Sequence, residues 1–310
     1  MAQSRFASGV AYVDGRVTPL AEACIPLTDY GYRRSDATYD VVSVCNGAFF
    51  RLDDHLARFR ASMQALRLDP ELSDGDIRAI LIRLVRLSAL REAYVAMDCL
   101  RGAPKTGLPP HPLNCRNYLA AFARPYVSVI SPEAQARGAH LIVAEVPRIP
   151  EASIDPTVKN FHWGDLTQAL FQAHDCGADT AVLADSAGMV TEGPGFNVFS
   201  VTDNVVSTPD RGALAGITRM SVIELCAELG LRCEVRPVAV AELRAADELL
   251  ICTTAGGVMP VSRLDGRIMG NDRPGPISAT LRERYWKRRT EGWHATPVDY
   301  TPADYQEAAS

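Results

Sequence analysis

The chain has 310 residues, of which 47% are hydrophobic and 22% are charged, and its net charge is −5. This composition is ordinary for a globular protein, and the length allows two domains or one large α/β domain. The sequence carries no basic stripe, which argues against a nucleic acid partner. We find no signal peptide and no run of about 18 apolar residues, so we expect a cytoplasmic protein that does not enter a membrane.

The cysteines and histidines point away from a disulfide scaffold and from a metal site. The eight cysteines and six histidines are scattered, without a Cys-x-x-Cys pair or a His-Glu-x-x-His motif. The simplest interpretation is a set of reduced thiols in a protein that binds no metal.

The first half of the chain predicts strands with two amphipathic helices. Asp14-Gly15 and Asn46-Gly47 are turn pairs, and they divide two hairpins at 10–18 and 39–52. Apolar residues spaced by three and four predict a helix that starts near Asp53, and Ser73-Asp74 opens another. Further strands are expected at 93–100, 117–123 and 139–146, with a proline-rich loop at 104–114.

The second half alternates helices with strands. Because prolines punctuate its start, we place a domain linker at 147–153, between a smaller domain at 1–146 and a larger one at 154–310. Two α+β halves with mixed sheets are the expected architecture. Helices are predicted at about 162–175, 217–229, 240–246 and 277–290, and strands at 180–185, 196–201, 204–208, 232–238 and 248–253.

Lysine is rare in this chain. Of the 32 basic residues 29 are arginine, and the three lysines are Lys105, Lys159 and Lys287. Arginine stays protonated, whereas a desolvated lysine can lose its proton and become a nucleophile. Lys159 lies between an apolar stretch and a predicted helix. The scarcity of lysine alone does not distinguish a reactive Lys159 from an ordinary surface lysine, so other features of the sequence are needed to distinguish the two.

Three other features can be combined with Lys159. Glu192 stands among small residues before a strand, where a carboxylate could pair with a protonated ring nitrogen. Gly216 precedes a predicted helix, and the free N–H groups at a helix start bind phosphate. Arg58 follows His55 by one helical turn, and arginine is well suited to a multidentate grip on phosphate.

Each of these features also has an ordinary structural explanation. A turn, a helix cap and a solvated arginine would account for them one by one. Thr253-Thr254-Ala255 likewise ends a strand with hydroxyls and could line a ligand or merely turn the chain. Taken together, however, an amine, a carboxylate and a distributed phosphate grip are the protein groups expected around pyridoxal phosphate.

From about residue 9 to 290 the chain resembles the fold-type IV pyridoxal-phosphate aminotransferases. Within that group it is most similar to the (R)-selective amine transaminases. The resemblance implies a two-domain α/β architecture with mixed sheets, an active site at the domain interface, a homodimer, and pyridoxal 5'-phosphate as cofactor. It is carried by Ser35-Asp36-Ala-Thr-Tyr39-Asp40, Phe50-Arg-Leu-Asp-Asp-His55, Asp155-Pro-Thr-Val-Lys159-Asn160, Thr191-Glu192-Gly193, Asn197-Val-Phe199, Gly216-Ile-Thr-Arg219 and Cys252-Thr-Thr-Ala-Gly-Gly257.

The resemblance also assigns roles. It implies that Lys159 is the catalytic residue and carries the cofactor as an internal aldimine, while Glu192 pairs with the pyridine nitrogen. Leu214 is expected to pack on the ring. The residues expected to hold the phosphate are Arg58, Gly216, Ile217, Thr218 and Thr254. The positions that match the substrate pocket are Tyr39, Val41, Tyr94, Trp163, Thr253 and Ala255.

The chain departs from its relatives in the loop that follows Gly102. Related enzymes place an arginine there to bind a substrate carboxylate, whereas this loop is shorter and holds Lys105 instead. Lys105 could substitute with a less directional charge, and Arg34 is a second candidate. Solvated loop charge is the alternative for both.

The resemblance predicts ping-pong transamination between an (R)-configured primary amine or D-amino acid and a keto acid or ketone. A D-amino-acid or branched-chain aminotransferase is the nearest alternative, because it shares the chemistry and differs in its pocket. An aminodeoxychorismate lyase would keep the same lysine and glutamate. A binding protein without catalysis is a further alternative, which the combined presence of all these groups disfavours.

Overall fold

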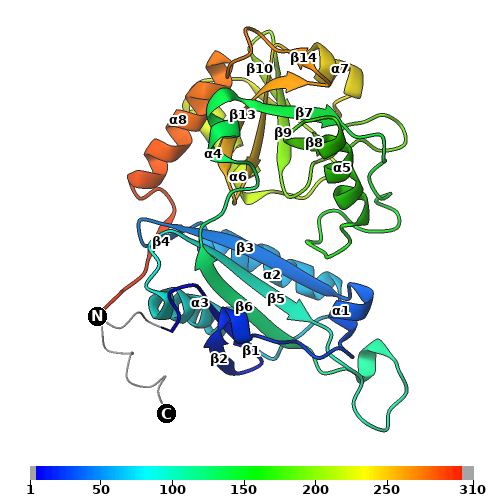
Figure 1. Ribbon diagram of the computed structural model, residues 1–310, viewed down its shortest axis with the longest axis vertical. Coiled ribbons are helices and arrows are strands. Elements are labelled where there is room, and N and C mark those ends of the chain that lie inside the picture. Colours follow the sequence, from blue (N-terminus) through cyan, green and yellow to red (C-terminus); the bar gives the residue numbers. More distant parts are fainter. Residues whose placement is uncertain (1–4, 302–310) are drawn as a thin grey trace. The chain divides into compact units, whose positions relative to one another are not determined.

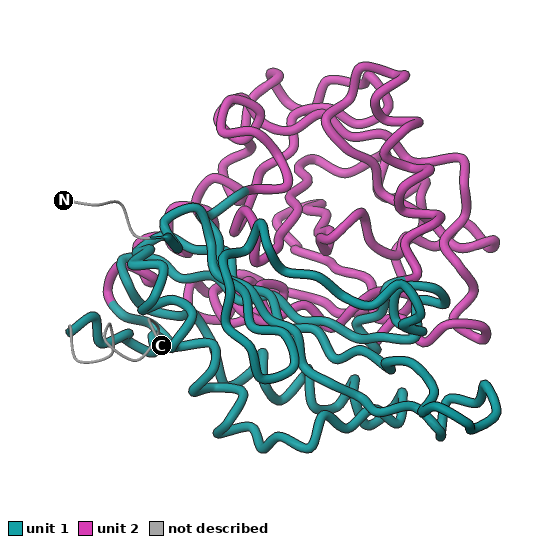
Figure 2. The backbone as a smooth tube through the Cα atoms, turned by 60° about the horizontal axis from the view of Figure 1, so that its bottom comes forward, with its two compact units in different colours: residues 1–127, 158–161, 292–310 teal, residues 128–157, 162–291 magenta. Residues whose placement is uncertain are grey.

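The computed structural model describes residues 5–301, which divide into two compact units (Figure 2). The first unit reaches Val127 and also includes Val158–Phe161 and the residues from Gly292 onward, while the second comprises Ser128–Thr157 and His162–Glu291. The division therefore differs from the expected one, because residues 147–153 lie inside the second unit. Within 5–301, no helix is long and apolar enough to cross a bilayer.

The first unit is built on an antiparallel sheet with the order β15-β4-β3-β5-β6-β1-β2. Both predicted hairpins are present, and Asp14, Gly15, Asn46 and Gly47 all have positive φ, as tight hairpin turns require. The strands are β1 (Val10–Val13), β2 (Arg16–Pro19), β3 (Ala37–Cys45), β4 (Ala48–Phe50), β5 (Ala93–Leu100), β6 (Tyr118–Pro125) and β15 (Ala295–Pro297).

Two helices, α2 (Leu52–Ala65) and α3 (Asp74–Ser88), cover one face of this sheet (Figure 1). A reciprocal capping box between Ser73 and Asp76 starts α3. Alternate strand residues such as Val42 and Val95 are buried in one core with Phe59 of α2. Since side chains alternate along a strand, the intervening residues of β3, β5 and β6 point to the opposite face. Shorter elements are η1 (Leu20–Glu22), α1 (Tyr30–Arg34) and η2 (Pro112–Asn114).

The second unit holds a mixed sheet with the order β11-β10-β9-β12-β13-β7-β8, and β14 pairs with β13. The pairs β10–β11, β13–β7 and β7–β8 are parallel and the others are antiparallel. Its strands are β7 (Ala139–Val143), β8 (Thr180–Val182), β9 (Asn197–Thr202), β10 (Val205–Thr208), β11 (Cys233–Val235), β12 (Glu248–Thr253), β13 (Gly257–Leu264) and β14 (Arg267–Ile268). Its helices are α4 (Pro132–Arg137), α5 (Gly164–Asp175), α6 (Ile217–Glu228), α7 (Val240–Ala245) and α8 (Pro276–Thr290).

β13 is the longest element that the sequence did not predict. Proline inside an apolar run argues against a strand, because it cannot donate to a ladder. Here Pro260 lies opposite Leu250 of β12, while the pairing with β7 begins only at Val261. The turn before β13 depends on Gly257, which has a φ of 70° and whose Cβ would lie 2.7 Å from the ring of Trp286.

Candidate active site

Lys159 is held along β3 by both of its backbone groups. Its carbonyl accepts hydrogen bonds from the Tyr39 amide at 3.1 Å and from the Thr38 hydroxyl at 2.7 Å. Its amide donates to the hydroxyl of Ser62 in α2 at 3.2 Å. The side chain then reaches the Tyr39 ring, with Nζ 4.4 Å from the ring centroid. Because its backbone is fixed and its side chain lies beside an aromatic ring, the Lys159 amine loses little conformational entropy when it is positioned to react.

Arg58 belongs to a buried charged cluster with Asp40 and His55. Its Nε and Nη2 donate to the two carboxylate oxygens of Asp40, each at 2.8 Å, and this pairing is bidentate. His55 Nδ1 lies 2.8 Å from Asp40 Oδ1. Asp40 is fully buried and His55 is almost so. Arg58, expected to bind phosphate, is thus positioned from within its own unit by a β3 carboxylate.

Burial and the neighbouring charges together set the protonation of this cluster. Burial favours the neutral form of Asp40, but the charge of Arg58 and the contact with His55 outweigh it and hold the pKa of Asp40 well below its usual range. Burial is also the largest effect on His55 and lowers its pKa. An ionised Asp40 can only accept, so the neutral imidazole carries its proton on Nδ1. Its Nε2 is buried without a hydrogen-bond partner among the described residues.

The predicted substrate residues of the first unit share the sheet face away from α2 and α3. Tyr39 and Val41 alternate with core residues of β3, and Tyr94 does so in β5. Burial raises the pKa of the Tyr94 hydroxyl to about 12, so it stays protonated and can donate. Asp98, opposite Tyr39 in the β3–β5 register, has its pKa raised to about 7 by burial.

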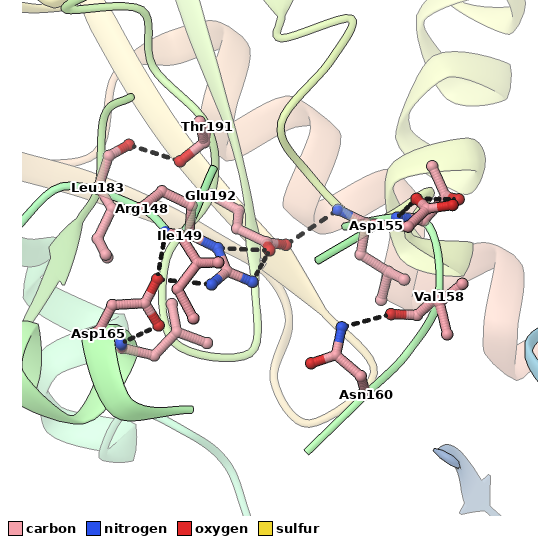
Figure 3. A network of polar contacts seen from close by, with 12 residues as sticks. Arg148, Ile149, Asp155, Val158, Asn160, Asp165, Leu183, Thr191 and Glu192 are labelled. Carbon is pink, nitrogen blue, oxygen red and sulfur yellow. Dashed lines mark hydrogen bonds and ion pairs between the residues drawn. The ribbon is translucent and has the colours of Figure 1, made fainter. Parts of the chain in front are cut away.

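Glu192 is buried in the second unit and held by an arginine that the sequence did not single out. Its Oε1 accepts from Nε and Nη2 of Arg148 at 3.3 and 3.1 Å. Arg148 in turn donates through Nη1 to Asp165 at 2.6 Å, and its guanidinium lies between the two carboxylates (Figure 3). An arginine in contact favours the charged form of a carboxylate, which is the form that can pair with a protonated ring nitrogen.

The loop before α6 is tied to the same glutamate. The Leu214 amide donates to Glu192 Oε2 at 3.0 Å, and the Leu214 carbonyl accepts from Asn197 Nδ2 at 2.8 Å. Gly216 follows as the N-cap of α6, and a Cβ there would lie 1.9 Å from Asn197 Oδ1. Glycine is therefore required at this position. Glu192 and the start of α6 are consequently fixed with respect to each other.

The remaining predicted residues of the second unit lie at strand and helix ends. Ile217 and Thr218 form the first turn of α6 and are buried, and no side chain caps that helix. Thr253 ends β12, and Thr254 and Ala255 follow it in the turn that leads into β13. Trp163 is the N-cap of α5.

Arg34 and Lys105, the two candidates for a substrate carboxylate, are both exposed. The guanidinium of Arg34 stacks on Tyr30, with 3.6 Å between its central carbon and the ring centroid. Lys105 belongs to the proline-rich loop, where its amide donates to the Asn114 carbonyl. Neither side chain has the buried setting of Arg58 or Arg148.

These groups suit pyridoxal phosphate. Lys159 supplies an amine, and Glu192 supplies a carboxylate paired with an arginine. The uncapped first turn of α6, joined to Glu192 through Leu214, presents backbone N–H groups of the kind that bind phosphate. The crowding at Gly216 leaves no room for a side chain at the residue that precedes this turn.

Three residues of these clusters were missed as site residues at the sequence level. Asp40 carried a usable signal, because an aspartate in an apolar strand needs a partner. Arg148 and Asp165 carried none. They meet Glu192 or each other across 44 and 17 positions of the chain, and only the fold brings them together.

Comparison with known proteins identifies the family to which the chain belongs. The family model of amino-transferase class IV matches residues 37–264. The D-alanine aminotransferase of Bacillus licheniformis is 31% identical over 277 residues, covering 86% of this chain and 93% of that protein. The branched-chain-amino-acid aminotransferase of Pseudomonas aeruginosa is 28% identical over 284 residues, covering 90% and 92%. The solved structure of the branched-chain amino acid aminotransferase from Thermobaculum terrenum in its PLP form has a TM-score of 0.82 at 29% identity, covering 94% of this chain and 98% of that one.

The fold and the site therefore define an aminotransferase of fold type IV that uses pyridoxal phosphate. The chain belongs to amino-transferase class IV, as its resemblance to that family predicted. Its substrates are accordingly small amino and keto compounds.

Proposed function

We propose that this aminotransferase moves an amino group between an (R)-configured primary amine or D-amino acid and a keto acid or ketone. The observation that carries the proposal is the setting of Lys159, whose amine lies against the Tyr39 ring while its backbone is held by Thr38, Tyr39 and Ser62. The (R) preference rests on the stretches around Tyr39, His55 and Lys159 that resemble (R)-selective amine transaminases.

In this proposal Lys159 carries the cofactor and then moves protons. When bound, pyridoxal phosphate withdraws electrons from the carbon that bears the substrate amine and so makes its hydrogen acidic. The Lys159 amine first acts as a base and takes that proton from the substrate carbon. It then acts as an acid and returns the proton to a nearby carbon of the cofactor. Glu192, held by Arg148, would keep the ring nitrogen of the bound cofactor protonated. A second carbonyl substrate reverses the steps.

The residues proposed to bind the phosphate are Arg58, Gly216, Ile217, Thr218 and Thr254, with Leu214 against the ring. Two features support these roles: the uncapped start of α6 and the bidentate grip of Asp40 on Arg58. The proposed pocket residues are Tyr39, Val41, Tyr94, Trp163, Thr253 and Ala255.

A branched-chain aminotransferase is the second candidate, because relatives of that name cover most of the chain. A donor panel separates the two. The holoenzyme is mixed with each enantiomer of 1-phenylethylamine, with D- and L-alanine and with L-leucine, and the loss of the visible cofactor band is followed. We expect conversion with (R)-1-phenylethylamine or D-alanine and little with the opposite hand. Equal conversion of both hands would reject the stereochemical proposal, and conversion by L-leucine alone would favour the second candidate.

The same assay tests the lysine. Lys159→Ala should abolish turnover and the visible band, while Lys287→Ala, which changes a lysine of α8, should alter neither. Full activity of Lys159→Ala would remove that residue from its proposed role. Pyruvate release without an amino acceptor would instead indicate a lyase.

A further inference from the structure

Arg124 is a charged residue of the first unit that the site described so far does not use. It lies in β6, directly opposite Tyr94 of β5 in the strand register. Its guanidinium carbon is 5.0 Å from the centroid of the Tyr94 ring. Its Nε is buried and has no hydrogen-bond partner among the described residues. A buried N–H that finds no partner in its own chain is unfavourable unless a ligand supplies one.

The orientation of Arg124 follows from the alternation along β6. Ala121 and Ala123 belong to the core beneath α2 and α3, so Phe122 and Arg124 point to the other face. Tyr94 lies on that face between them, and its ring stacks on Phe122 with the centroids 6.1 Å apart at 21°. Arg124 therefore shares a face with the proposed substrate residues Tyr39 and Tyr94.

Contacts connect this arginine to Lys159 within one unit. The Lys159 amine lies over the Tyr39 ring, the Arg124 guanidinium lies over the Tyr94 ring, and Tyr39 and Arg124 are both near enough to the Tyr94 hydroxyl to affect its pKa. Asp98 is an acid on the same face. Burial alone accounts for its raised pKa, and no ion pair between Asp98 and Arg124 is found among the described residues. The positive charge of Arg124 thus stands on the substrate face without a carboxylate from the described residues.

We propose that Arg124 binds the carboxylate of the keto acid or D-amino acid, with the Tyr94 hydroxyl as a neighbouring donor. This inference rests on the proposed function and deepens it by naming a specificity-determining residue. Arginine presents several donors in a planar fork that matches a carboxylate. Arg124 would take over the function of the arginine that is missing from the loop after Gly102. Neither Lys105 nor Arg34 is then needed to bind the carboxylate.

The test compares acceptors with and without a carboxylate. The holoenzyme is first loaded with (R)-1-phenylethylamine, and the return of the visible cofactor band is then titrated with pyruvate or with propanal. Arg124→Gln and Arg124→Lys are compared with Arg16→Gln, which changes an exposed arginine at the start of β2. Lys105→Gln and Arg34→Gln are measured in parallel.

Arg124→Gln should raise the pyruvate concentration needed for half-saturation about 30-fold or more. The propanal concentration needed for half-saturation should change less than about threefold. Arg124→Lys should fall between it and the unchanged protein, because lysine keeps the charge without the fork. Arg16→Gln should affect neither acceptor.

Three outcomes would overturn the inference. Equal losses with pyruvate and propanal would show that Arg124 only supports Tyr94. Unchanged pyruvate binding in both Arg124 variants would exclude it, and a selective loss in Lys105→Gln or Arg34→Gln alone would move the role there. Failure of the starting enzyme to accept (R)-1-phenylethylamine would count against the proposed function alone. In that case the enzyme is loaded with D-alanine or L-leucine instead, and pyruvate and propanal are compared as acceptors in the same way.

Discussion

Two buried arginines, Arg58 and Arg148, each bind a carboxylate through two of their nitrogens. Breaking a buried pair by removing one partner is strongly destabilising, since it leaves an uncompensated charge. The two pairs therefore act as positioning devices. Asp40 orients the arginine proposed for phosphate, and Arg148 orients the glutamate proposed for the ring nitrogen.

Asp98 provides a residue-level test through the pH dependence of stability. Its folded pKa of about 7 lies above the ordinary value of 3.8, so the folded state holds its proton more tightly than the unfolded state does. Below about pH 4 the carboxyl is protonated in both states and does not lower the free energy of unfolding. As the pH rises from about 4 to about 7, its ionisation reduces that free energy. Asp98→Asn removes that penalty. We expect it to raise the free energy of unfolding by about 1–2 kcal/mol at pH 8, a value reduced for the partial exposure of Asp98.

Urea unfolding at pH 5, 6, 7 and 8 measures this gain. The gain should grow with pH, whereas Asp175→Asn, at an exposed position of α5, should show no such trend. A gain that stays constant across this range would contradict a raised pKa at Asp98.

At the scale of elements, the start of α6 depends on one glycine. A Cβ at position 216 would lie 1.9 Å from Asn197 Oδ1, and Asn197 itself holds the Leu214 carbonyl. Gly216→Ala must therefore displace the loop that links Glu192 to the helix. We expect affinity for pyridoxal phosphate to fall at least tenfold, about 1.4 kcal/mol, because the phosphate-binding N–H groups move.

Equilibrium titration of the apoprotein with pyridoxal phosphate measures this effect. The matched control is Gly75→Ala in α3, where the nearest heavy atom to an added Cβ is 3.6 Å away and alanine also favours a helix. Unchanged cofactor affinity in Gly216→Ala would show that the loop adapts without disturbing the site.

Elements with strong local signals were predictable, and elements defined by distant partners were not. Turn pairs and helical periodicity located both hairpins of the first unit, α2 and α3. β13 was missed because Pro260 interrupts its apolar run, and β15 because three residues carry too little periodicity. The sheet of the first unit is antiparallel rather than mixed, since pairing direction follows from topology and not from local sequence.

The candidate site divides in the same way. Motif resemblance singled out Lys159, Glu192 and Gly216 as candidates, because the order and spacing of short motifs can be read from the chain. The partners Asp40, Arg148 and Asp165 come from other elements and appear only when the fold is known. Arg124 had no signal at all, since its meaning depends on its register with Tyr94.

For the whole molecule, we propose the homodimer and the cytoplasmic location that the family resemblance and the composition suggested. The chain mass is 33.6 kDa, so light scattering coupled to size-exclusion chromatography should give about twice that value. The thermal midpoint should also rise with protein concentration if folding and association are linked. A mass equal to one chain at micromolar concentration would refute the dimer.

The path of the chain between the two units has a consequence for biosynthesis. Val158–Phe161 joins a unit in which strands β1 to β6 come earlier in the chain. Strand β15, some 245 residues after β4, then completes the edge of that sheet beside β4. A ribosome that has released only the first 127 residues therefore exposes a sheet without its last edge strand and without the lysine. Such an unprotected edge invites pairing with other nascent chains, and closing it requires contacts of long sequence separation that form slowly. Truncated or stalled products should thus aggregate, and the Lys159 amine reaches its place only after the strands of the first sheet have formed.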